Sequence, residues 1–358
     1  MYFSSAPARV CLYGEHQDYL GLRVIPAAIN LRFNISSTEK NGKGIKIQSL
    51  DTDEVVTLPT RISSLSSNQK DFRNYLESGL LALKNRIRDI EFPSLSVKIQ
   101  SDIPIASGLS SSAALLVCWI KHLDGILNLD ISESEIAELA YDAEHNILGI
   151  PCGRMDQYAS SFGSIISLIC TEPPLLSSLP KPELSLIVVD SNTPKLTSEV
   201  HGKKVNEIKK AVFEIEEITK LDLKDISIDH VRRNEQKLSR QDYRILEGVV
   251  SIKSDTEIAE KELLKSNSDL HVLGKLLTSQ HQNLRENIGV SLPILDKIVA
   301  TGLRKRALGG KLTGAGLGGS VVLLVEDENA KIKQELEREL RLQVWSVNID
   351  EGAFFEKR

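Results

Sequence analysis

The chain is poor in the residue patterns that mark secreted, zinc-binding and membrane-spanning proteins. It has only four cysteines among 358 residues. They form no CxxC pair and have no matching histidine spacing, so we expect no zinc site and free thiols in a reducing cytoplasm. The N-terminus lacks a basic region followed by an apolar stretch, which predicts that there is no signal peptide. No apolar run reaches about 18 residues, so no membrane span is expected.

The chain also lacks a strong charge of one sign. Lysine and arginine together number 44 against 49 acidic residues, and the net charge is −5. The two signs are interspersed without a long block of either. Because nonspecific nucleic-acid binding needs a basic surface, we expect no nucleic-acid partner. The length suggests two domains or one large one, and a hydrophobic content of 41% is ample for a core.

The most informative stretch is residues 104–114, which read PIASGLSSSAA. It follows a strand-like segment at 95–100 and opens an apolar helical run at about 111–127. A turn of small residues at a helix start leaves backbone N–H groups free to hold an anion such as phosphate. The three serines add hydroxyls for phosphate oxygens or a divalent metal. The alternative is that they only cap the helix, since serine is favoured there.

A second glycine-rich loop lies far away, at residues 313–320, before an apolar strand at 320–325. Glycine in such a loop also serves tight turns or close backbone packing. The presence of two such loops in one chain favours a nucleotide-phosphate site.

The remaining periodicity mixes strands and helices in both halves of the chain. We expect further strands at residues 9–13, 24–29, 31–36, 44–49, 184–189 and 344–348. Helical patterns lie at 72–87, 133–146 (capped by Ser132), about 200–220, 256–265 and 269–288. This order predicts an α+β protein with a cleft between two domains.

Two further segments carry polar chemistry. Glu15, His16 and Asp18 directly follow Gly14 at the end of an expected strand, where carboxylates and an imidazole can bind the hydroxyls of a polyol. Glu144 lies near a helix end. Asp156 follows a loop rich in Gly and Pro, where a carboxylate can orient or deprotonate a hydroxyl nucleophile. A solvated turn and an ordinary helix cap are the competing interpretations.

Taken in order, these segments resemble the GHMP small-molecule kinases, and among them the galactokinases. Residues 8–29 resemble the motif GRVNLIGEHxDYNxGxVLPxAI, and 104–113 match PxxxGLSSSA. The pieces AEH and PCGxMDQ stand at 143–145 and 151–157, a WxNY-like segment at 72–75, a SLRDxYEVSCPELD-like helix at 279–296, and the third motif at 311–319. The similarity covers nearly the whole chain.

The resemblance implies a GHMP kinase fold. A ribosomal-S5-like domain would span 1–185 and a ferredoxin-like domain 186–358, with the active site between them. The implied activity is that of an ATP-dependent sugar kinase, which transfers the γ-phosphoryl group to a monosaccharide hydroxyl. The anomeric hydroxyl and galactose are the first expectations. The implied cofactor is Mg²⁺, and the implied partners are the sugar and ATP, in a cytoplasmic monomer or weak homodimer.

The resemblance also assigns site residues. Arg9 and Asp156 match the catalytic pair, and Ser112 and Glu144 match the positions that hold Mg²⁺. The implied sugar-binding residues are Glu15, His16, Asp18, Gly153 and His201. The implied ATP-binding residues are Pro104, Gly108, Leu109, Ser110, Ser111, Ser112 and Ala113. The third motif would support the cleft from the second domain.

Some positions depart from the galactokinase pattern. When Leu196 and Ser198 are aligned with the family, His201 stands where a sugar-contacting tyrosine is usual. The other departures are Leu20 for Asn, Ala8 for Gly, and Arg154 at the variable position of CGxMDQ. A missing tyrosine with a cation nearby also suits galacturonate, an amino sugar or another aldose. Whether His201 contacts the sugar, and whether Asp156 is a true base, stay open here.

Two alternatives differ more strongly. A mevalonate kinase belongs to the same superfamily, but the Asp18–Tyr19 pair and residues 155–157 favour a sugar. A non-catalytic sensor that binds ATP and sugar would lose residues of the second motif, and that motif is intact here.

Overall fold

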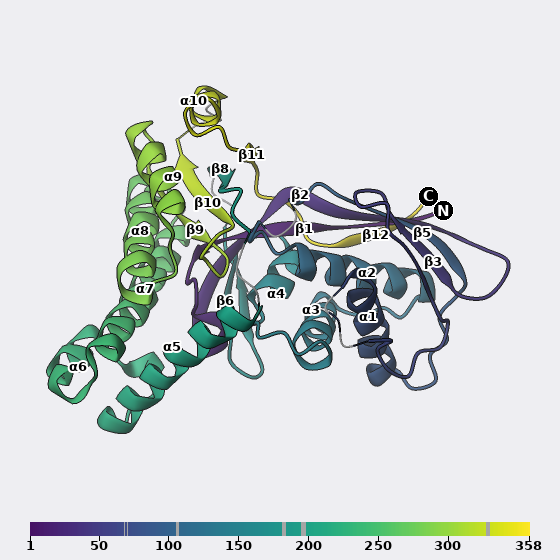
Figure 1. Ribbon diagram of the computed structural model, residues 1–358, viewed down its shortest axis with the longest axis horizontal. Coiled ribbons are helices and arrows are strands. Elements are labelled where there is room, and N and C mark those ends of the chain that lie inside the picture. Colours follow the sequence, from purple (N-terminus) through teal and green to yellow (C-terminus); the bar gives the residue numbers. More distant parts are fainter. Residues whose placement is uncertain (68, 70, 105–106, 181–183, 195–197, 327–329) are drawn as a thin grey trace.

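The computed structural model describes residues 1–67, 69, 71–104, 107–180, 184–194, 198–326 and 330–358. Within these residues, the chain builds two sheets with helices packed against them (Figure 1). The larger sheet has the strand order β12-β1-β2-β5-β3-β4, and β6 joins it through β2 and carries β7. Its strands are β1 (Tyr2–Tyr13), β2 (Arg23–Glu39), β3 (Ile45–Ser49), β4 (Val55–Leu58), β5 (Leu95–Ser101), β6 (Ile166–Ile169), β7 (Leu175–Ser178) and β12 (Phe354–Lys357).

One face of the larger sheet is covered by helices. Along β5, Leu95, Val97 and Ile99 are buried and alternate with exposed side chains, as expected where one face packs on a core. That core is completed by helices from between the strands. These are α1 (Phe72–Arg86), α2 (Ser111–Leu127) and α3 (Glu133–Tyr141), which continues as a π-helical turn at Asp142–Ile147. Helix α4 (Met155–Phe162) packs in a smaller apolar cluster with residues of β1, β2 and β6.

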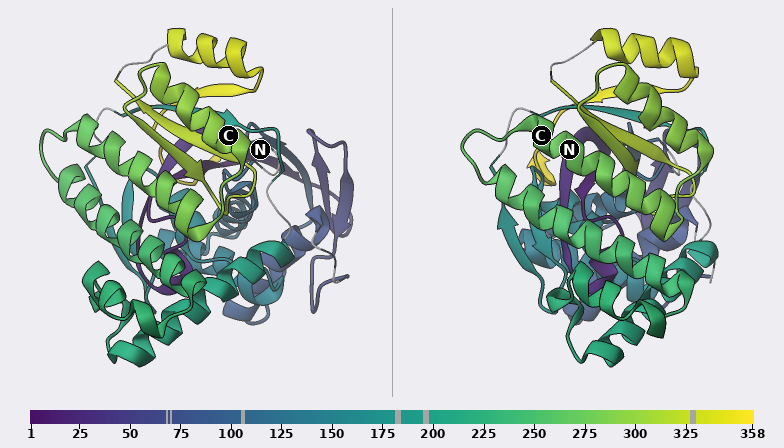
Figure 2. Two further views of the ribbon diagram at one scale, coloured as in Figure 1. Left: turned by 60° about the vertical axis from the view of Figure 1, so that its left-hand side comes forward. Right: turned by 90° about the vertical axis from the view of Figure 1, so that its left-hand side faces the viewer.

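The second sheet is antiparallel, with the order β11-β8-β10-β9. Its strands are β8 (Ser185–Asp190), β9 (Gly309–Thr313), β10 (Ser320–Val325) and β11 (Val344–Val347). Helices α8 and α9 lie against β9, and α7 runs beside α8 (Figure 2). The helices of this part are α5 (Ser198–Thr219), α6 (Ile228–Arg233), α7 (Arg240–Leu263), α8 (Leu270–Asn283), α9 (Pro293–Arg304) and α10 (Ala330–Leu340).

A shared apolar cluster joins the two sheets. It contains Val10 and Leu12 of β1, Val322 and Leu324 of β10, and Leu277 of α8. Burial of apolar surface stabilises by roughly 25 cal/mol per Å², so this cluster stabilises the packing of the two sheets against each other. Beside this cluster, the end of β1 meets the loop before α2 and the end of β9: the amide of Arg9 donates to the carbonyl of Leu109, and that of Cys11 to the hydroxyl of Thr313.

The structure confirms most of the expected elements and changes a few. The strands expected at 24–29 and 31–36 are one long strand, β2, which pairs with β6 at its start and with β5 in its second half. The helix expected at 256–265 is the end of the much longer α7. Ser132 caps α3 as predicted, accepting a hydrogen bond from the amide of Glu135.

The end of the chain returns to the first sheet. Strand β12 pairs with β1, and the amino group of Met1 donates to the carbonyl of Arg358 at 3.0 Å. Strand β8 begins the second sheet at Ser185, next to the expected boundary at 185/186. Strand β12 lies with the first sheet, although the expected division grouped it with the second part.

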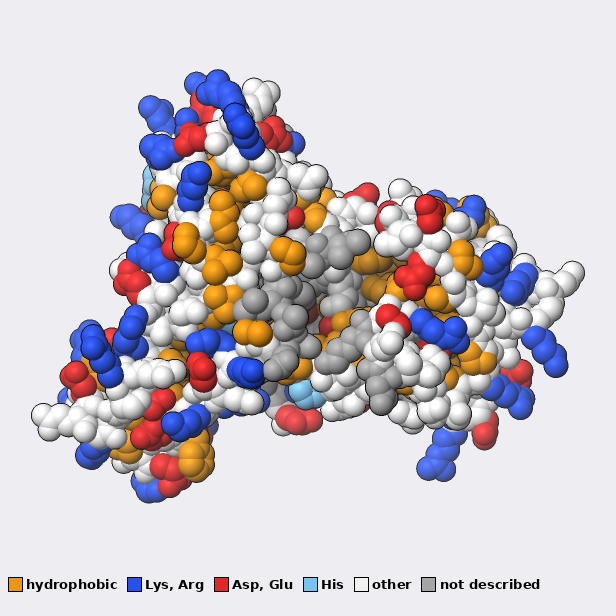
Figure 3. All heavy atoms as spheres, viewed as in Figure 1, with side chains coloured by type: hydrophobic (Ala, Val, Ile, Leu, Met, Phe, Trp, Pro, Cys, Tyr) orange, Lys and Arg blue, Asp and Glu red, His pale blue; other side chains and the backbone are white. Residues whose placement is uncertain are grey.

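The surface and the thiols agree with the sequence. Lysine, arginine and acidic side chains are interspersed over the face seen in Figure 3. All four cysteines are free, and Cys152 is the only one of them that is not fully buried. Among the helices of the described residues, none has the length and apolar character required to cross a membrane.

Candidate active site

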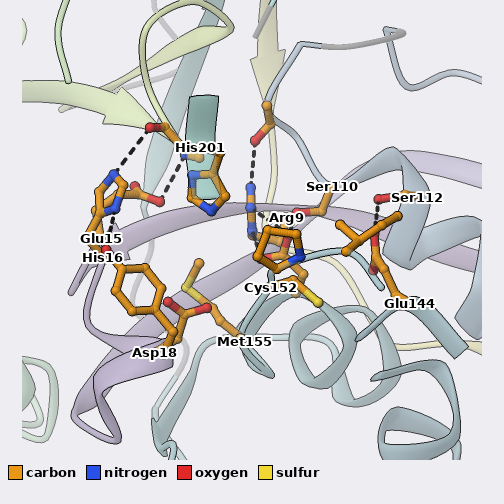
Figure 4. A pocket seen from close by; sticks show the side chains of 18 of the residues that line it. Arg9, Glu15, His16, Asp18, Ser110, Ser112, Glu144, Cys152, Met155 and His201 are labelled. Carbon is orange, nitrogen blue, oxygen red and sulfur yellow. Dashed lines mark hydrogen bonds and ion pairs between the residues drawn. The ribbon is translucent and has the colours of Figure 1, made fainter. Parts of the chain in front are cut away.

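The segments singled out in the sequence meet around one cavity of about 350 Å³. Its walls come from β1 and the loop after it, the start of α2, the loop before α4, α5 and the loop after β9 (Figure 4). The expected residues that line it are Arg9, Glu15, His16, Asp18, Gly108, Ser110, Ser112, Glu144, Gly153, Asp156 and His201. Thus residues from Arg9 near the start of the chain to Ala315 near its end face one space.

Four expected ATP-binding residues do not line this cavity. Leu109 and Ala113 are fully buried and pack in the core below the loop. Pro104 accepts a hydrogen bond from Ser107 through its carbonyl, and Ser111 is the first residue of α2. Their neighbours Ile105 and Ala106 lie outside the described residues. The expectation that these four bind ATP stays a prediction.

The two glycine-rich loops touch through their backbones. At Gly108, where φ is 77°, an added Cβ would lie 2.9 Å from the carbonyl oxygen of Thr313. At Gly314 it would lie 2.7 Å from the carbonyl oxygen of Gly108. Only glycine permits this approach. The start of α2, with its free N–H groups, is thereby brought to the cavity, where it can bind phosphate.

Arg9 and Asp156 form a bidentate pair. Arg9 Nε donates to Oδ1 of Asp156 at 2.8 Å, and Nη2 donates to Oδ2 at 2.8 Å. The third nitrogen of the guanidinium, Nη1, donates to the carbonyl of Gly108 at 2.7 Å. Arg9 is 4% exposed and Asp156 28% exposed, so the carboxylate opens to the cavity and the arginine supports it from behind. Asp156 stands in the first turn of α4, a helix that the sequence analysis raised only through the alternative of a helix cap at this residue.

A second carboxylate lies on the phosphate side. Oε1 of Glu144 accepts from the hydroxyl of Ser112 at 2.7 Å, and its Oε2 accepts from Nε2 of Gln157 at 2.8 Å. Glu144 belongs to the π-helical turn that extends α3, and such turns are frequent at functional sites. In the described part of the chain, no three His, Cys, Asp or Glu side chains gather as a metal cluster. The paired oxygens of Ser112 and Glu144 suit Mg²⁺ as two of its ligands when phosphate and water complete its shell.

The opposite end of the cavity is built around Glu15 and His16. Glu15 is buried, and its oxygens accept from Lys311 Nζ at 2.7 Å and from the amide of Gly314 at 2.9 Å. His16 Nδ1 lies 2.8 Å from the Tyr19 hydroxyl, and Nε2 lies 3.2 Å from the carbonyl of Ala315. Burial, reinforced by His201 nearby, lowers the pKa of His16 to about 3. The ring is therefore neutral, and the carbonyl partner identifies Nε2 as its donor nitrogen.

Asp18 fills the space that a side chain at position 153 would take. A Cβ built on Gly153 would lie 2.0 Å from Oδ2 of Asp18. Burial raises the pKa of Asp18 to about 7, and the charge of Asp156 adds to the effect. The glycine of the PCG segment thus lets a carboxyl from the β1–β2 loop stand beside the cavity.

His201 and Arg154 have different surroundings. The ring of His201, on α5, lies 6.0 Å from that of His16 between centroids and lines the cavity. Leu196, used for the alignment that singled out His201, lies outside the described residues. Arg154 turns away: its Nε donates to Glu138 at 2.9 Å, and its guanidinium lies 4.4 Å from the Tyr141 ring centroid. Arg154 does not line the cavity.

Some cavity residues were not named as site residues from the sequence. Tyr19, Tyr75, Cys152 and Met155 line the cavity, and Lys311 supports Glu15 from the second sheet. All of them fall inside the quoted motif segments. Their place in those segments could have indicated that they belong to the site. The direction of each side chain, however, depends on contacts between distant elements.

Comparison with known proteins shows the family to which the chain belongs. The family model for the GHMP kinases N terminal domain matches residues 74–164, and that for GHMP kinases C terminal matches 259–342. The galactokinase galactose-binding signature matches residues 2–36. Fold and site therefore define a GHMP kinase.

Relatives that align over about nine-tenths of the chain identify a family within the GHMP kinases. A galactokinase of Pyrococcus furiosus is 31% identical over 335 residues, which cover 91% of this chain and 89% of that protein. A galactokinase of Haemophilus influenzae is 29% identical, covering 89% of this chain and 84% of that protein. The chain belongs to the galactokinase family.

Solved structures give the same result. The galactokinase of Lactococcus lactis, solved in complex with galactose, superposes with a TM-score of 0.86 at 25% identity and covers 98% of this chain and 94% of that one. The mevalonate kinase of Methanococcus jannaschii, with a TM-score of 0.74 and 24% identity over 97% of this chain and 98% of that one, shares the fold. The expected GHMP kinase fold and the expected ATP-dependent sugar kinase are confirmed. The roles of the individual site residues stay predictions.

Proposed function

We propose that this protein transfers the γ-phosphoryl group of ATP to the anomeric hydroxyl of galactose. The observation that carries the proposal is the Arg9–Asp156 pair, which stands between the phosphate loop and the polar end of the cavity. Phosphoryl transfer depends mainly on positioning and charge neutralisation, and this pair supplies both at the point where the two substrates would meet.

In the proposed reaction, the sugar hydroxyl approaches the carboxylate of Asp156. The oxygen–phosphorus bond to the sugar forms as the bond to the ADP oxygen breaks, and the hydroxyl proton passes to Asp156 and then to solvent. Arg9 holds the carboxylate in one orientation through two hydrogen bonds. The same guanidinium places positive charge beside the loop that would hold the γ-phosphoryl group.

Ser112 and Glu144 would hold Mg²⁺ in this proposal. When bound, the ion supplies positive charge to the phosphate oxygens. The protein's own contribution is to hold the two oxygen ligands together, with Gln157 fixing the far oxygen of Glu144. Such supporting bonds orient a ligand and strengthen its affinity for the metal.

The sugar would lie at the other end of the cavity. Asp18 and His16 present hydrogen-bonding atoms there, and His201 forms a side wall. Gly153 leaves room for the carboxyl of Asp18. The galactokinase relatives and the galactose-binding signature favour galactose. A uronate substrate would need a cation near the sugar, and Arg154 does not supply it, because it is paired with Glu138 and faces away from the cavity.

A panel of monosaccharides tests the proposal. Galactose, glucose, galacturonate, galactosamine and mevalonate are each incubated with the protein, ATP and Mg²⁺, and ADP release is measured. We expect galactose to give the highest kcat/KM and a product phosphorylated at the anomeric position. If another compound on the panel is clearly preferred, galactose is the wrong acceptor. If the protein binds galactose without releasing ADP, the kinase assignment itself fails. A monomer or weak homodimer remains the prediction for the oligomeric state.

A further inference from the structure

Ser110 has a side-chain partner that the sequence did not indicate. Its hydroxyl donates to Oδ2 of Asp156 at 2.5 Å. The motif predicts that the serines of this loop bind phosphate or cap α2. Ser110 is the N-cap residue of α2, yet its side chain makes no capping bond. Its hydroxyl is therefore committed to the catalytic carboxylate and not to the helix.

The backbone of Ser110 is in a conformation that favours glycine. Its φ and ψ are 65° and 40°, in the left-handed region. A side chain with a Cβ is disfavoured there, whereas glycine adopts this conformation freely. A serine at such a position costs stability, and residues held in this way cluster at functional sites. Compared with glycine, serine adds a Cβ, which this backbone disfavours, and a hydroxyl, which bonds to Asp156.

The contact also closes a ring of bonds around the reaction centre. Gly108 and Ser110 are two residues apart in the phosphate loop, and each is tied to the catalytic pair. Gly108 accepts from Arg9, Arg9 donates twice to Asp156, and Asp156 accepts from Ser110. Ser110 is 5% exposed, so its hydroxyl is held in this ring by its surroundings. The loop that would hold the phosphate and the carboxylate that would meet the sugar are thus linked directly.

From this geometry we propose that Ser110 is a positioning residue for Asp156, and not an ATP ligand through its side chain. This inference rests on the proposed function. Arg9 approaches Asp156 from β1, and Ser110 approaches it from the phosphate loop. When both residues bond to Asp156, its carboxylate is fixed relative to the site of the γ-phosphoryl group. Without Ser110, the hydrogen bond that holds Asp156 to the loop before α2 is lost.

The test compares Ser110→Gly with the parent protein. Glycine allows the same loop conformation, keeps the backbone N–H groups and removes the hydroxymethyl side chain with its hydrogen bond to Asp156. We expect equal or higher thermal stability, a kcat reduced by roughly 10- to 100-fold, and a KM for ATP within about twofold of the parent. The acid limb of the kcat/KM profile should move to higher pH, because the carboxylate loses a donor that favours its charged form. An unchanged kcat, or a loss confined to the KM for ATP, overturns the proposal.

Two further variants separate this role from loop flexibility. Ser110→Ala also lacks the hydroxyl but is less flexible than glycine, so we expect the same loss of kcat with lower thermal stability. If Ser110→Ala keeps the parent kcat, the effect in Ser110→Gly comes from flexibility and the proposal is wrong. Ser164→Gly is the matched control, since Ser164 also has a positive φ, 57°, and does not line the cavity. It should leave kcat and the pH profile unchanged.

A readout independent of turnover separates this proposal from the kinase assignment. Carbon-13 NMR follows the carboxyl resonance of Asp156, identified by its loss in Asp156→Asn, across a pH titration without substrates. We expect its midpoint in Ser110→Gly to lie at higher pH than in the parent. An identical midpoint overturns the positioning role even if the protein is a kinase. A shifted midpoint supports that role even if no tested sugar is phosphorylated.

Discussion

Because Gly153 lies against Asp18, adding one methyl group at position 153 tests whether Asp18 positions the sugar. In Gly153→Ala, the new Cβ would lie 2.0 Å from Oδ2, 2.3 Å from Cγ and 2.7 Å from Cβ of Asp18. Ordinary contact begins at 3.4 Å, so the carboxyl must move by about 1.4 Å. Since Cβ of Asp18 is itself too close, rotation of the carboxylate alone does not relieve the overlap.

A shift of that size should show in sugar binding. A displacement of about 1 Å in a positioning group can cost roughly 100-fold in rate, and we expect the sugar KM to rise by 10- to 100-fold, in round numbers. The KM for ATP should stay within about twofold, because the loop at Gly108 lies at the other end of the cavity. Overpacking should also cost about 1–3 kcal/mol of folding stability, so kinetics are measured well below the unfolding transition.

Gly202→Ala is the matched control. Gly202 adjoins His201 on α5, but an added Cβ there meets only Cγ of Pro151, at 3.7 Å. Alanine within a helix should stabilise by about 0.5–1 kcal/mol and leave both KM values unchanged. If Gly153→Ala folds and retains the parent KM for sugar, Asp18 does not orient the substrate and our account of this end of the cavity is wrong.

Two other predictions concern the metal and pH. Glu144→Gln should raise the Mg²⁺ concentration for half-maximal activity by about tenfold or more, and an unchanged Mg²⁺ titration would remove Glu144 as a ligand. The folded protein raises the pKa of Asp18 from 3.8 to about 7, so between those values it holds a proton that the unfolded chain has released. Asp18 therefore lowers the free energy of unfolding as pH rises through this window. Asp18→Asn should gain stability relative to the parent by roughly 1–3 kcal/mol between about pH 4 and 7 in denaturant titrations. A constant difference between the two proteins across that range would contradict the raised pKa.

Local patterns were enough to predict much of the fold. The helix expected at 111–127 is α2 with the same bounds, and the strand expected at 95–100 is β5 within one residue, because apolar periodicity marks both. The segments that carry Arg9, Ser112 and Asp156 were also expected to meet. Their order along the chain matched the family motifs, and the structure brings them to one cavity.

The errors and omissions arise from contacts between distant parts of the chain. Nothing local shows that β2 is continuous through the change from β6 to β5, or that β12 returns to β1. The direction of Arg154 depends on Glu138 and Tyr141, which come from α3. The link from Ser110 to Asp156 spans 46 residues and needs a left-handed serine, which no serine-rich pattern predicts.

The most direct test of the central claim is to follow the phosphoryl group itself. The protein is incubated with galactose, Mg²⁺ and ATP labelled in its γ-phosphoryl group, and the labelled products are separated. We predict one labelled sugar phosphate for each ADP formed by the parent, and a rate at least roughly 100-fold lower in Asp156→Asn, with ATP binding retained. Label released only as inorganic phosphate, or an Asp156→Asn variant as fast as the parent, would contradict the account.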